Sequence, residues 1–209
     1  AYCTVERFDN TLADAMRRAG CVGINFGVDA INDEMLQRLA RPYRVTDITS
    51  AVEACRNAGI TVMLDLLLGG PGETPTTLTA TIEGARQLNP DAVGAALGIR
   101  VYPNTPLADL VARSGPMASN PNLRGQTENN SSFIQPVFYL DSALGRDLQS
   151  IQRVLYKQIE GDPRFMVGDP DARANYDYSD NQPLVQAIAA GARGADRKST
   201  RLNSSHESP

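Results

Sequence analysis

The stretch TVMLDLLLGGPGET, residues 61–74, decides the fold that the sequence predicts. An apolar run leads into a turn with three glycines and one proline, which predicts a buried strand that ends in a tight loop. Glycines would let the loop backbone approach a ligand, and Thr74 followed by Pro75 is a typical start of a helix. Because α/β proteins bind ligands at the carboxyl ends of their strands, the loop is a candidate binding site. The alternative is a plain strand-to-helix turn.

Strand and helix patterns alternate on both sides of this stretch. Strands are expected at 1–8, 21–29, 61–68 and 91–101, and helices at 10–19, 31–39, 46–58 and 75–88. The helix patterns place apolar residues three and four apart, with Asn10 as the expected cap of the first helix. This order is typical of parallel βαβ units. The sequence therefore predicts an α/β fold in which each strand pairs with its predecessor.

The second half of the chain has weaker patterns. Residues 116–136 are rich in Asn, Ser, Pro and Gly, which indicates a linker or a long surface loop. A short strand at 137–140 and a helix over 141–160 follow, and a last helix is expected at 183–191. Residues 137–195 are therefore expected to form a mainly helical C-terminal region.

The composition is that of a globular protein. The chain has 209 residues, of which 42% are hydrophobic and 21% are charged, enough for a sizeable core. The formal net charge of -4 gives no sign of a nucleic-acid partner or an anionic membrane. No apolar run approaches the roughly 18 residues of a membrane span. We therefore expect a cytoplasmic protein.

The three cysteines and the end of the chain need separate treatment. Cys3, Cys21 and Cys55 have spacings that fit no metal knuckle, so they are expected to be reduced core residues. The sequence DRKSTRLNSSH near the end looks like the translation of a widely used sequencing adapter. Residues 196–209 are therefore expected to be an artefact, and they hold His206, the only histidine of the sequence.

Four segments together resemble the radical SAM superfamily, and in particular its cobalamin-dependent branch. They are RFD at 7–9, AGCVGINFGVDA at 19–30, LLLGGPGET at 66–74 and YPNTPLA at 102–108. The resemblance implies that residues 1–115 are the C-terminal half of a partial (β/α) TIM-type barrel, with about four parallel strands and their helices. It also implies a family-specific C-terminal region at 137–195.

The resemblance implies a chemistry as well. Such enzymes cleave S-adenosylmethionine at a 4Fe-4S cluster to start radical reactions. The family's CxxxCxxC cluster motif is absent here, and three separated cysteines do not replace it, because the cluster needs three thiolates placed together. We therefore expect a truncated part of an enzyme, inactive alone, with its cluster ligands outside this chain.

The resemblance also implies which residues hold S-adenosylmethionine. The guanidinium of Arg7 would grip the methionyl carboxylate, although an exposed surface arginine is the alternative. Asp29 would hold ribose hydroxyls or the methionyl ammonium, or else cap the helix at Ile31. The loop glycines would approach the adenosine; they are Gly69, Gly70 and Gly72.

Four further residues complete the expected site. Glu73 belongs to the same loop, where we favour an electrostatic role at the helix N-terminus. Arg100 and Tyr102 would offer backbone groups to the adenine edge, or Tyr102 would only wall the pocket. Asp65 interrupts an apolar strand, so it either points into the barrel toward substrate or pairs with a buried cation.

The preferred hypothesis is a fragment of a radical SAM enzyme that, when intact, carries out methylation or ring formation on a small-molecule substrate. Cobalamin rests on the resemblance alone, because no residue of the chain would ligate it. Two other classes stay open at this point. One is a (β/α)-barrel enzyme whose GGPGE loop binds a phosphate group, and the other is a non-catalytic binding module.

Overall fold

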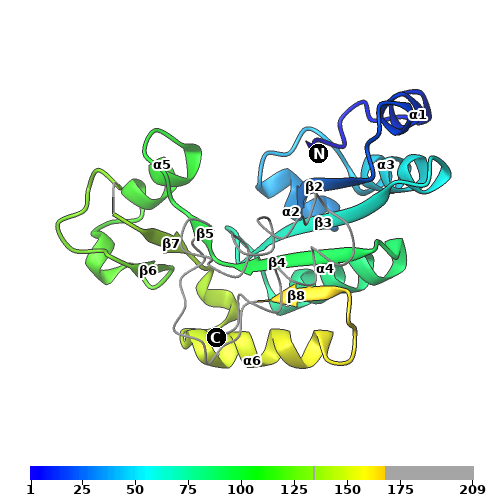
Figure 1. Cartoon of the computed structure of the whole chain (residues 1–209). Coiled ribbons are helices and arrows are strands. Elements are labelled where there is room, and N and C mark those ends of the chain that lie inside the picture. The colour runs from blue at the N-terminus through cyan, green and yellow to red at the C-terminus, as the bar shows by residue number, and fades with distance from the viewer. Residues whose placement is uncertain (134, 168–209) are drawn as a thin grey trace, which may run out of the picture.

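The structure, a computed structural model, describes residues 1–133 and 135–167, which form two sheets and their helices (Figure 1). The first part contains β1 (Tyr2–Cys3), α1 (Asn10–Arg18), β2 (Gly23–Asp29), α2 (Asp33–Arg38), α3 (Val45–Asn57), β3 (Thr61–Leu68), α4 (Pro75–Leu88) and β4 (Ala92–Leu97). The second part contains β5 (Ile99–Arg100), α5 (Pro106–Arg113), β6 (Leu123–Gly125), β7 (Val137–Tyr139), α6 (Leu148–Ile159) and β8 (Phe165–Val167).

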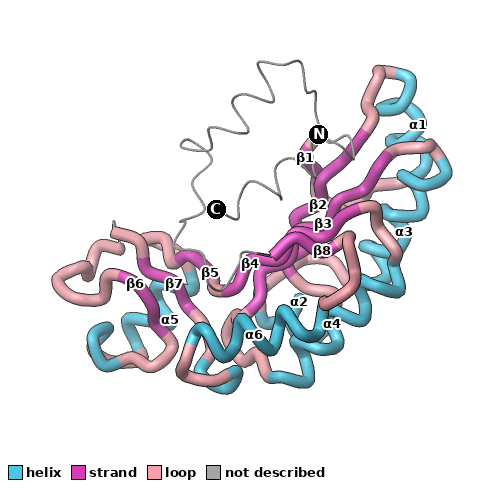
Figure 2. The backbone as a smooth tube through the Cα atoms, turned by 60° about the horizontal axis from the view of Figure 1, so that its bottom comes forward, coloured by secondary structure: helices cyan, strands magenta, loops and turns pink. Residues whose placement is uncertain are grey.

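The larger sheet is entirely parallel and has the strand order β1-β2-β3-β4-β8. Strands β2, β3 and β4 each pair with the strand that precedes them, which confirms the predicted α/β architecture. Figure 2 shows the main helices gathered on one face of this sheet. The sheet does not close on itself among the described residues, so the architecture is a partial barrel.

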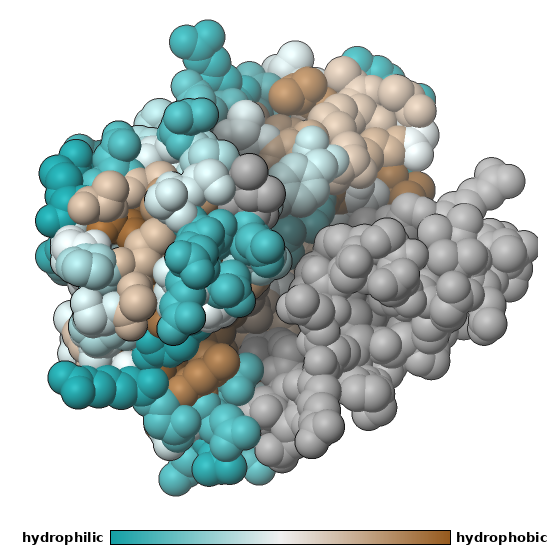
Figure 3. Space-filling view, turned by 90° about the vertical axis from the view of Figure 1, so that its left-hand side faces the viewer, coloured by the Kyte–Doolittle hydropathy of each residue, from teal (hydrophilic) through white to brown (hydrophobic). Residues whose placement is uncertain are grey.

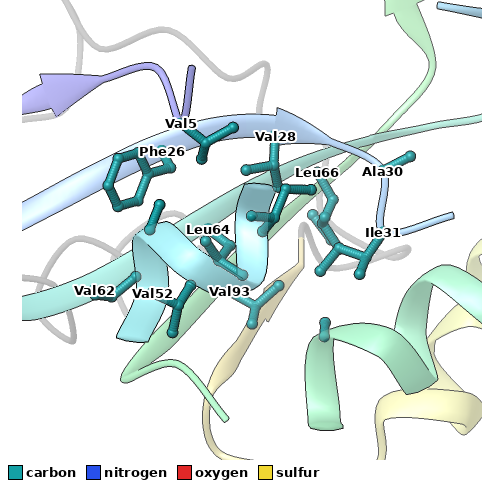
Figure 4. Close-up of a cluster of buried hydrophobic side chains, with 14 of the residues drawn as sticks. Val5, Phe26, Val28, Ala30, Ile31, Val52, Val62, Leu64, Leu66 and Val93 are labelled. Atoms are coloured by element: carbon teal, nitrogen blue, oxygen red, sulfur yellow. The ribbon is translucent and has the colours of Figure 1, made fainter. Parts of the chain in front are cut away.

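The sequence of β3 explains which face the helices cover. Its residues alternate between buried and half-buried positions, and the buried ones join the helices in one apolar core (Figure 4). The fully buried positions of β3 are Val62, Leu64, Leu66 and Leu68. Since side chains alternate across a strand, Met63, Asp65 and Leu67 point to the opposite, concave face of the sheet.

Helix α4 begins where the sequence predicted. The hydroxyl of Thr74 accepts a hydrogen bond from the Thr77 backbone N–H, and Pro75 occupies the first turn. The helix ends at Asn89, which adopts the left-handed conformation with φ 50°. These local signals lie within the segment itself, which is why the sequence could reveal them.

Several predicted boundaries were wrong. The first strand covers only Tyr2–Cys3, and Asp9 rather than Asn10 caps α1, since its carboxylate accepts from the Leu12 N–H at 2.8 Å. The expected strand at 91–101 breaks at Gly98, whose φ of 91° turns the chain out of the large sheet. The residues after this break form β5 of a second sheet.

The second sheet is small and antiparallel, with the order β5-β7-β6. It has its own apolar cluster with α5, which includes Val101, Val111 and Val137. The expected loop at 116–136 therefore contributes β6 and a buried Asn130 to this lobe. Figure 3 views the molecule from this end, where hydrophilic surface surrounds smaller hydrophobic patches.

The C-terminal part also differs in detail from the prediction. The short strand expected at 137–140 is present as β7, but the following helix starts only at Leu148, because Asp147 supplies its N-cap. Strand β8 adds a fifth parallel strand that was not expected. The expected helix at 183–191 and the suspected artefact at 196–209 lie outside the described residues.

The described cysteines are free thiols. Cys55 is buried in α3, as predicted, and Cys3 and Cys21 are half-buried in or beside strands. Among the helices that the structure describes, none has the length and apolar character needed to cross a membrane.

Truncating the central strand tests the core. Leu64→Ala should lower the free energy of unfolding by about 2–5 kcal/mol, because it leaves a cavity beneath fully buried neighbours. The matched variant Leu12→Ala removes the same atoms from a side chain that is 44% exposed, and should change stability by less than about 1 kcal/mol. Urea unfolding followed by circular dichroism measures both. Equal losses would contradict this account of the core.

Candidate functional site

The glycine loop, residues 69–73, lies at the carboxyl end of β3 and is held by two carboxylates of this chain. The Glu73 carboxylate turns back and accepts hydrogen bonds from the N–H groups of Gly69 and Gly70. Asp141 Oδ2 accepts from the N–H of Gly72 at 2.7 Å. The three N–H groups that a phosphate would need are therefore already bonded within the chain.

Glu73 is only 1% exposed, although it is a carboxylate. Burial raises its pKa to about 7, against the opposing effect of the two N–H donors, and the nearby Asp141 charge adds to the rise. The N-terminus of α4 is capped by Thr74 instead. Glu73 thus closes its own loop, and its expected electrostatic role toward the helix is secondary to these two hydrogen bonds.

The side-chain space at the loop glycines is filled by neighbouring parts of the molecule. A Cβ at Gly69 would lie 2.3 Å from Leu140 Cδ1, and one at Gly72 would lie 2.2 Å from Arg38 Nη1. The glycines are therefore needed for the close packing of α2 and the segment after β7 on the loop. A contact between this loop and adenosine stays a prediction.

Asp29 ends β2 in an unusual conformation that aims its side chain at the neighbouring loop. The register of β2 on β3 shifts between Gly27 and Asp29, and Asp29 has φ 62°. Its carboxylate forms an ion pair with Arg41. Tyr43 donates a hydrogen bond to the Gly27 carbonyl at 3.1 Å and so supports the bulge. Asn32 caps α2, so the alternative of Asp29 as the helix cap is wrong.

Burial is the main influence on the Asp29 carboxyl. It raises the pKa, the charge and hydrogen bond of Arg41 lower it, and the charge of Asp65 raises it further. The register of β2 on β3 also places the two carboxylates in one neighbourhood, because Gly27 pairs with Asp65 and Asp29 pairs with Leu66. The sequence expected both as site residues, and the fold brings them together.

Asp65 lies on the concave face, with glycines on both neighbouring strands. The register places it opposite Gly27 on β2 and Gly94 on β4, and a Cβ at Gly94 would lie 2.5 Å from Asp65 Oδ1. Asp65 Oδ2 accepts from Asn25 Nδ2 at 2.8 Å and from the Tyr2 hydroxyl at 3.4 Å. Both partners are neutral, which favours the predicted orientation into the barrel over a buried ion pair.

Asn25 offers an unused hydrogen-bonding group beside Asp65. Its Oδ1 atom is buried and has no hydrogen-bond partner within residues 1–133 and 135–167. Burial of an unpaired acceptor costs free energy, so such an atom suits a donor from a bound ligand. Burial also raises the pKa of Asp65, while the hydrogen bonds from Asn25 and Tyr2 lower it.

The other expected residues lie elsewhere. Arg7 is exposed on the turn after β1. The guanidinium of Arg100 packs against the rings of Tyr102 and Phe138, at 5.4 and 5.9 Å from their centroids, and donates to the Gln135 carbonyl at 2.8 Å. Both Arg100 and Tyr102 therefore lie against the small sheet, and their contact with adenine stays a prediction.

Sequence reasoning missed Arg41, Tyr43, Asn25 and Asp141. Arg41 and Tyr43 occupy a loop with no periodic pattern, although Arg41 follows Asp29 by only twelve positions. Asn25 could have been found as a polar residue in an apolar strand, as Asp65 was. Asp141 is 69 residues from Gly72, so its contact depends on the tertiary fold.

These groups define a class of site. Asp29 and its partner Arg41 lie at the carboxyl end of β2, and Asp65 and the unpaired amide oxygen of Asn25 lie within the neighbouring strands β3 and β2. Such a set is suited to a small polar ligand that has hydroxyls or an amine together with a carboxylate. Within the described part of the chain, no three Cys, His, Asp or Glu side chains cluster to hold a metal ion, so these residues do not fit an iron-sulfur cluster.

Comparison with known proteins finds similarity to radical SAM proteins. The sequence model of the radical SAM superfamily matches residues 2–84. The tryptophan 2-C-methyltransferase of Streptomyces laurentii is 31% identical over 137 residues, which are 63% of this chain and 22% of that protein.

Solved structures show the same fold. TsrM from Kitasatospora setae, a radical S-adenosylmethionine methyltransferase with cobalamin and a 4Fe-4S cluster bound, matches with a TM-score of 0.76 and 23% identity, over 99% of this chain and 45% of that one. TsrM with tryptophan and a S-adenosylmethionine analogue bound gives 0.75 and 24%, over 97% and 46%. The chain therefore spans less than half the length of these relatives.

The buried Glu73 predicts an unusual pH dependence. Its folded pKa of about 7 lies above the ordinary 4.5, so the folded state binds a proton that the unfolded state has released between these values. The contribution of Glu73 to stability is therefore present below about pH 4.5 and lost as the pH rises through about 7, by up to about 3 kcal/mol.

Glu73→Gln keeps an acceptor for the loop N–H groups but does not titrate. Urea unfolding of both proteins between pH 4.5 and 7.5 should give a steeper fall of stability with pH in the unaltered chain. Comparison of the two proteins removes the contributions of other carboxyl groups. Parallel curves would show that Glu73 has an ordinary pKa.

Proposed function

We propose that the whole protein is a cobalamin-dependent radical SAM enzyme that transfers a methyl group to a small-molecule substrate, and that this chain supplies part of its S-adenosylmethionine site. The likeness to tryptophan 2-C-methyltransferase and to TsrM supports methyl transfer. One observation carries the binding role: the Asp29–Arg41 ion pair lies at the carboxyl end of β2, where Asp29 pairs with Leu66, the residue that follows Asp65 on β3.

The charges at this mouth complement the ligand. S-adenosylmethionine presents a carboxylate, an ammonium group and two ribose hydroxyls. The side chain of Arg41 is 40% exposed, so its fork can reach a carboxylate while it remains paired with Asp29. Asp29 then accepts from the ammonium or a hydroxyl. In this proposal Arg41 replaces Arg7 as the carboxylate-binding residue.

The concave face supplies the remaining contacts. Asp65 accepts hydrogen bonds from ligand hydroxyls or from substrate, and the unpaired Asn25 Oδ1 accepts another. The missing side chains at Gly27 and Gly94 leave the space that the Tyr2 hydroxyl and the Asp65 carboxylate occupy.

The family's cofactors have different support in this chain. A bound 4Fe-4S cluster supplies the electron that cleaves S-adenosylmethionine, but the described residues offer no thiolate set to hold it, so we derive no step through it. Cobalamin comes to the proposal from the TsrM structure. The division into residues 1–115 and 137–195 is also a proposal, and the pairs β5·β7 and β4·β8 join the two parts.

No observation favours the other two classes over this one. A phosphate site would need the N–H groups that Glu73 and Asp141 already bind. A non-catalytic module gives no reason for buried carboxylates beside an unpaired acceptor.

Titration calorimetry with S-adenosylmethionine tests the proposed site in the whole protein. Arg41→Ala should weaken binding by about tenfold or more, because it removes a charge-assisted contact to the ligand carboxylate. Arg44→Ala removes an exposed arginine from the same loop and should leave affinity within about twofold. Arg7→Ala tests the earlier assignment. A large loss in Arg7→Ala with none in Arg41→Ala would reverse the roles of the two arginines.

A further inference from the structure

The segment after β7, residues 140–142, contacts the glycine loop and forms hydrogen bonds with it. Asp141 accepts from the Gly72 N–H at 2.7 Å through its side chain, and its own backbone N–H donates to the Gly69 carbonyl at 2.9 Å. Leu140 fills the space beside Gly69. Asp141 thus accepts a hydrogen bond from Gly72 and donates one to Gly69, so it is bonded to the loop at two points.

Asp141 is itself firmly held by the small sheet. The backbone of Asn122, next to β6, accepts from the Leu140 N–H at 2.7 Å, and its side-chain Oδ1 accepts from the Ser142 N–H at 2.8 Å. Asp141 Oδ1 accepts from the Ala143 N–H at 2.9 Å, and the Tyr139 hydroxyl donates to Oδ2 at 3.4 Å. Hydrogen bonds from Tyr139 and Ala143 therefore hold both oxygens of the Asp141 carboxylate, independently of its bond to the loop.

Glu73 cannot provide the same anchor. It is part of the loop and moves with it, so its bonds to Gly69 and Gly70 set the loop's shape but not its place in the molecule. A loop with three glycines has many accessible conformations, and the entropy cost of fixing it favours an external attachment. Asp141, which comes from the second sheet, supplies that attachment.

We propose that Asp141 is a positioning residue that fixes the glycine loop beside the carboxylate cluster and so prepares the S-adenosylmethionine site. This inference rests on the proposed function. It means that the small sheet, distant from Asp29 in sequence, takes part in cofactor binding through two hydrogen bonds, one from the Gly72 N–H to the Asp141 side chain and one from the Asp141 backbone to the Gly69 carbonyl. Asp141 touches no ligand in this role and acts through the loop.

The test combines amide hydrogen exchange with binding in the whole protein. Asp141→Ala removes the acceptor for the Gly72 N–H, and should speed exchange in a peptide spanning 66–74 by about tenfold. It should also weaken S-adenosylmethionine binding by about tenfold. Asp141→Asn keeps one acceptor oxygen, which can serve the Gly72 N–H at the expense of the bond from the Ala143 N–H, and should restore both in part. Asp147→Ala removes a different exposed capping carboxylate of the same region and should change neither.

A second route guards against an unfolded variant. Asn122→Ala weakens the attachment of the segment at 140–142 without touching the loop, so it should change exchange and affinity in the same direction, by a smaller factor. Unchanged exchange in Asp141→Ala would overturn the inference. Faster exchange with unchanged affinity would overturn it too, as would Asp141→Asn behaving like the alanine variant.

Failure of the proposed function can be distinguished from failure of this inference by a different measurement. If the unaltered whole protein does not bind S-adenosylmethionine, the proposed function fails. Amide exchange then decides alone whether Asp141 holds the loop, because that measurement needs no ligand. Faster exchange in the alanine variant, restored in part by asparagine, would support the positioning of the loop by Asp141.

Discussion

The parallel pairing of β3 with β2 on one side and β4 on the other is the constraint on which the rest of the structure depends. Both neighbours bond to β3 along most of its length, so its alternating side chains must serve two different environments. The leucines on one face pack under the helices. The residues on the other face, Asp65 among them, line the concave side. The same pairing brings the ends of β2 and β3 together, which places Asp29 near the glycine loop.

Burial of carboxylates on β2, on β3 and in the glycine loop costs free energy, and the chain offsets this cost with specific partners. Asp29 is paired with Arg41, Asp65 accepts from Asn25, and Glu73 accepts from two loop N–H groups. Desolvation still dominates, because the pKa of all three groups is raised. Raised carboxyl pKa values that gather in one part of a molecule are typical of binding and catalytic sites, where groups are arranged for a ligand rather than for stability.

The two sheets depend on each other more than their separate cores suggest. The chain leaves the large sheet at Gly98, builds the small sheet and then returns along α6 to add β8 beside β4. On the way back, Asp141 bonds the glycine loop. A region of irregular composition therefore holds the glycine loop in place. The Asn side chains of this region form hydrogen bonds with its backbone, and its Asn and Gly residues are typical of turns.

The sequence alone determined the parallel α/β architecture and the start of α4, and it indicated Asp29 and Asp65 as candidate site residues. Periodicity, the Thr74-Pro75 pair and polar residues within or at the end of an apolar strand are local signals, and each acts within a few residues. Tertiary structure alone decided the shift of β2 at Asp29, the partners Arg41 and Asp141, and the return of β8. These depend on contacts between segments far apart in the chain, and no local pattern encodes which distant carboxylate will meet a given backbone N–H.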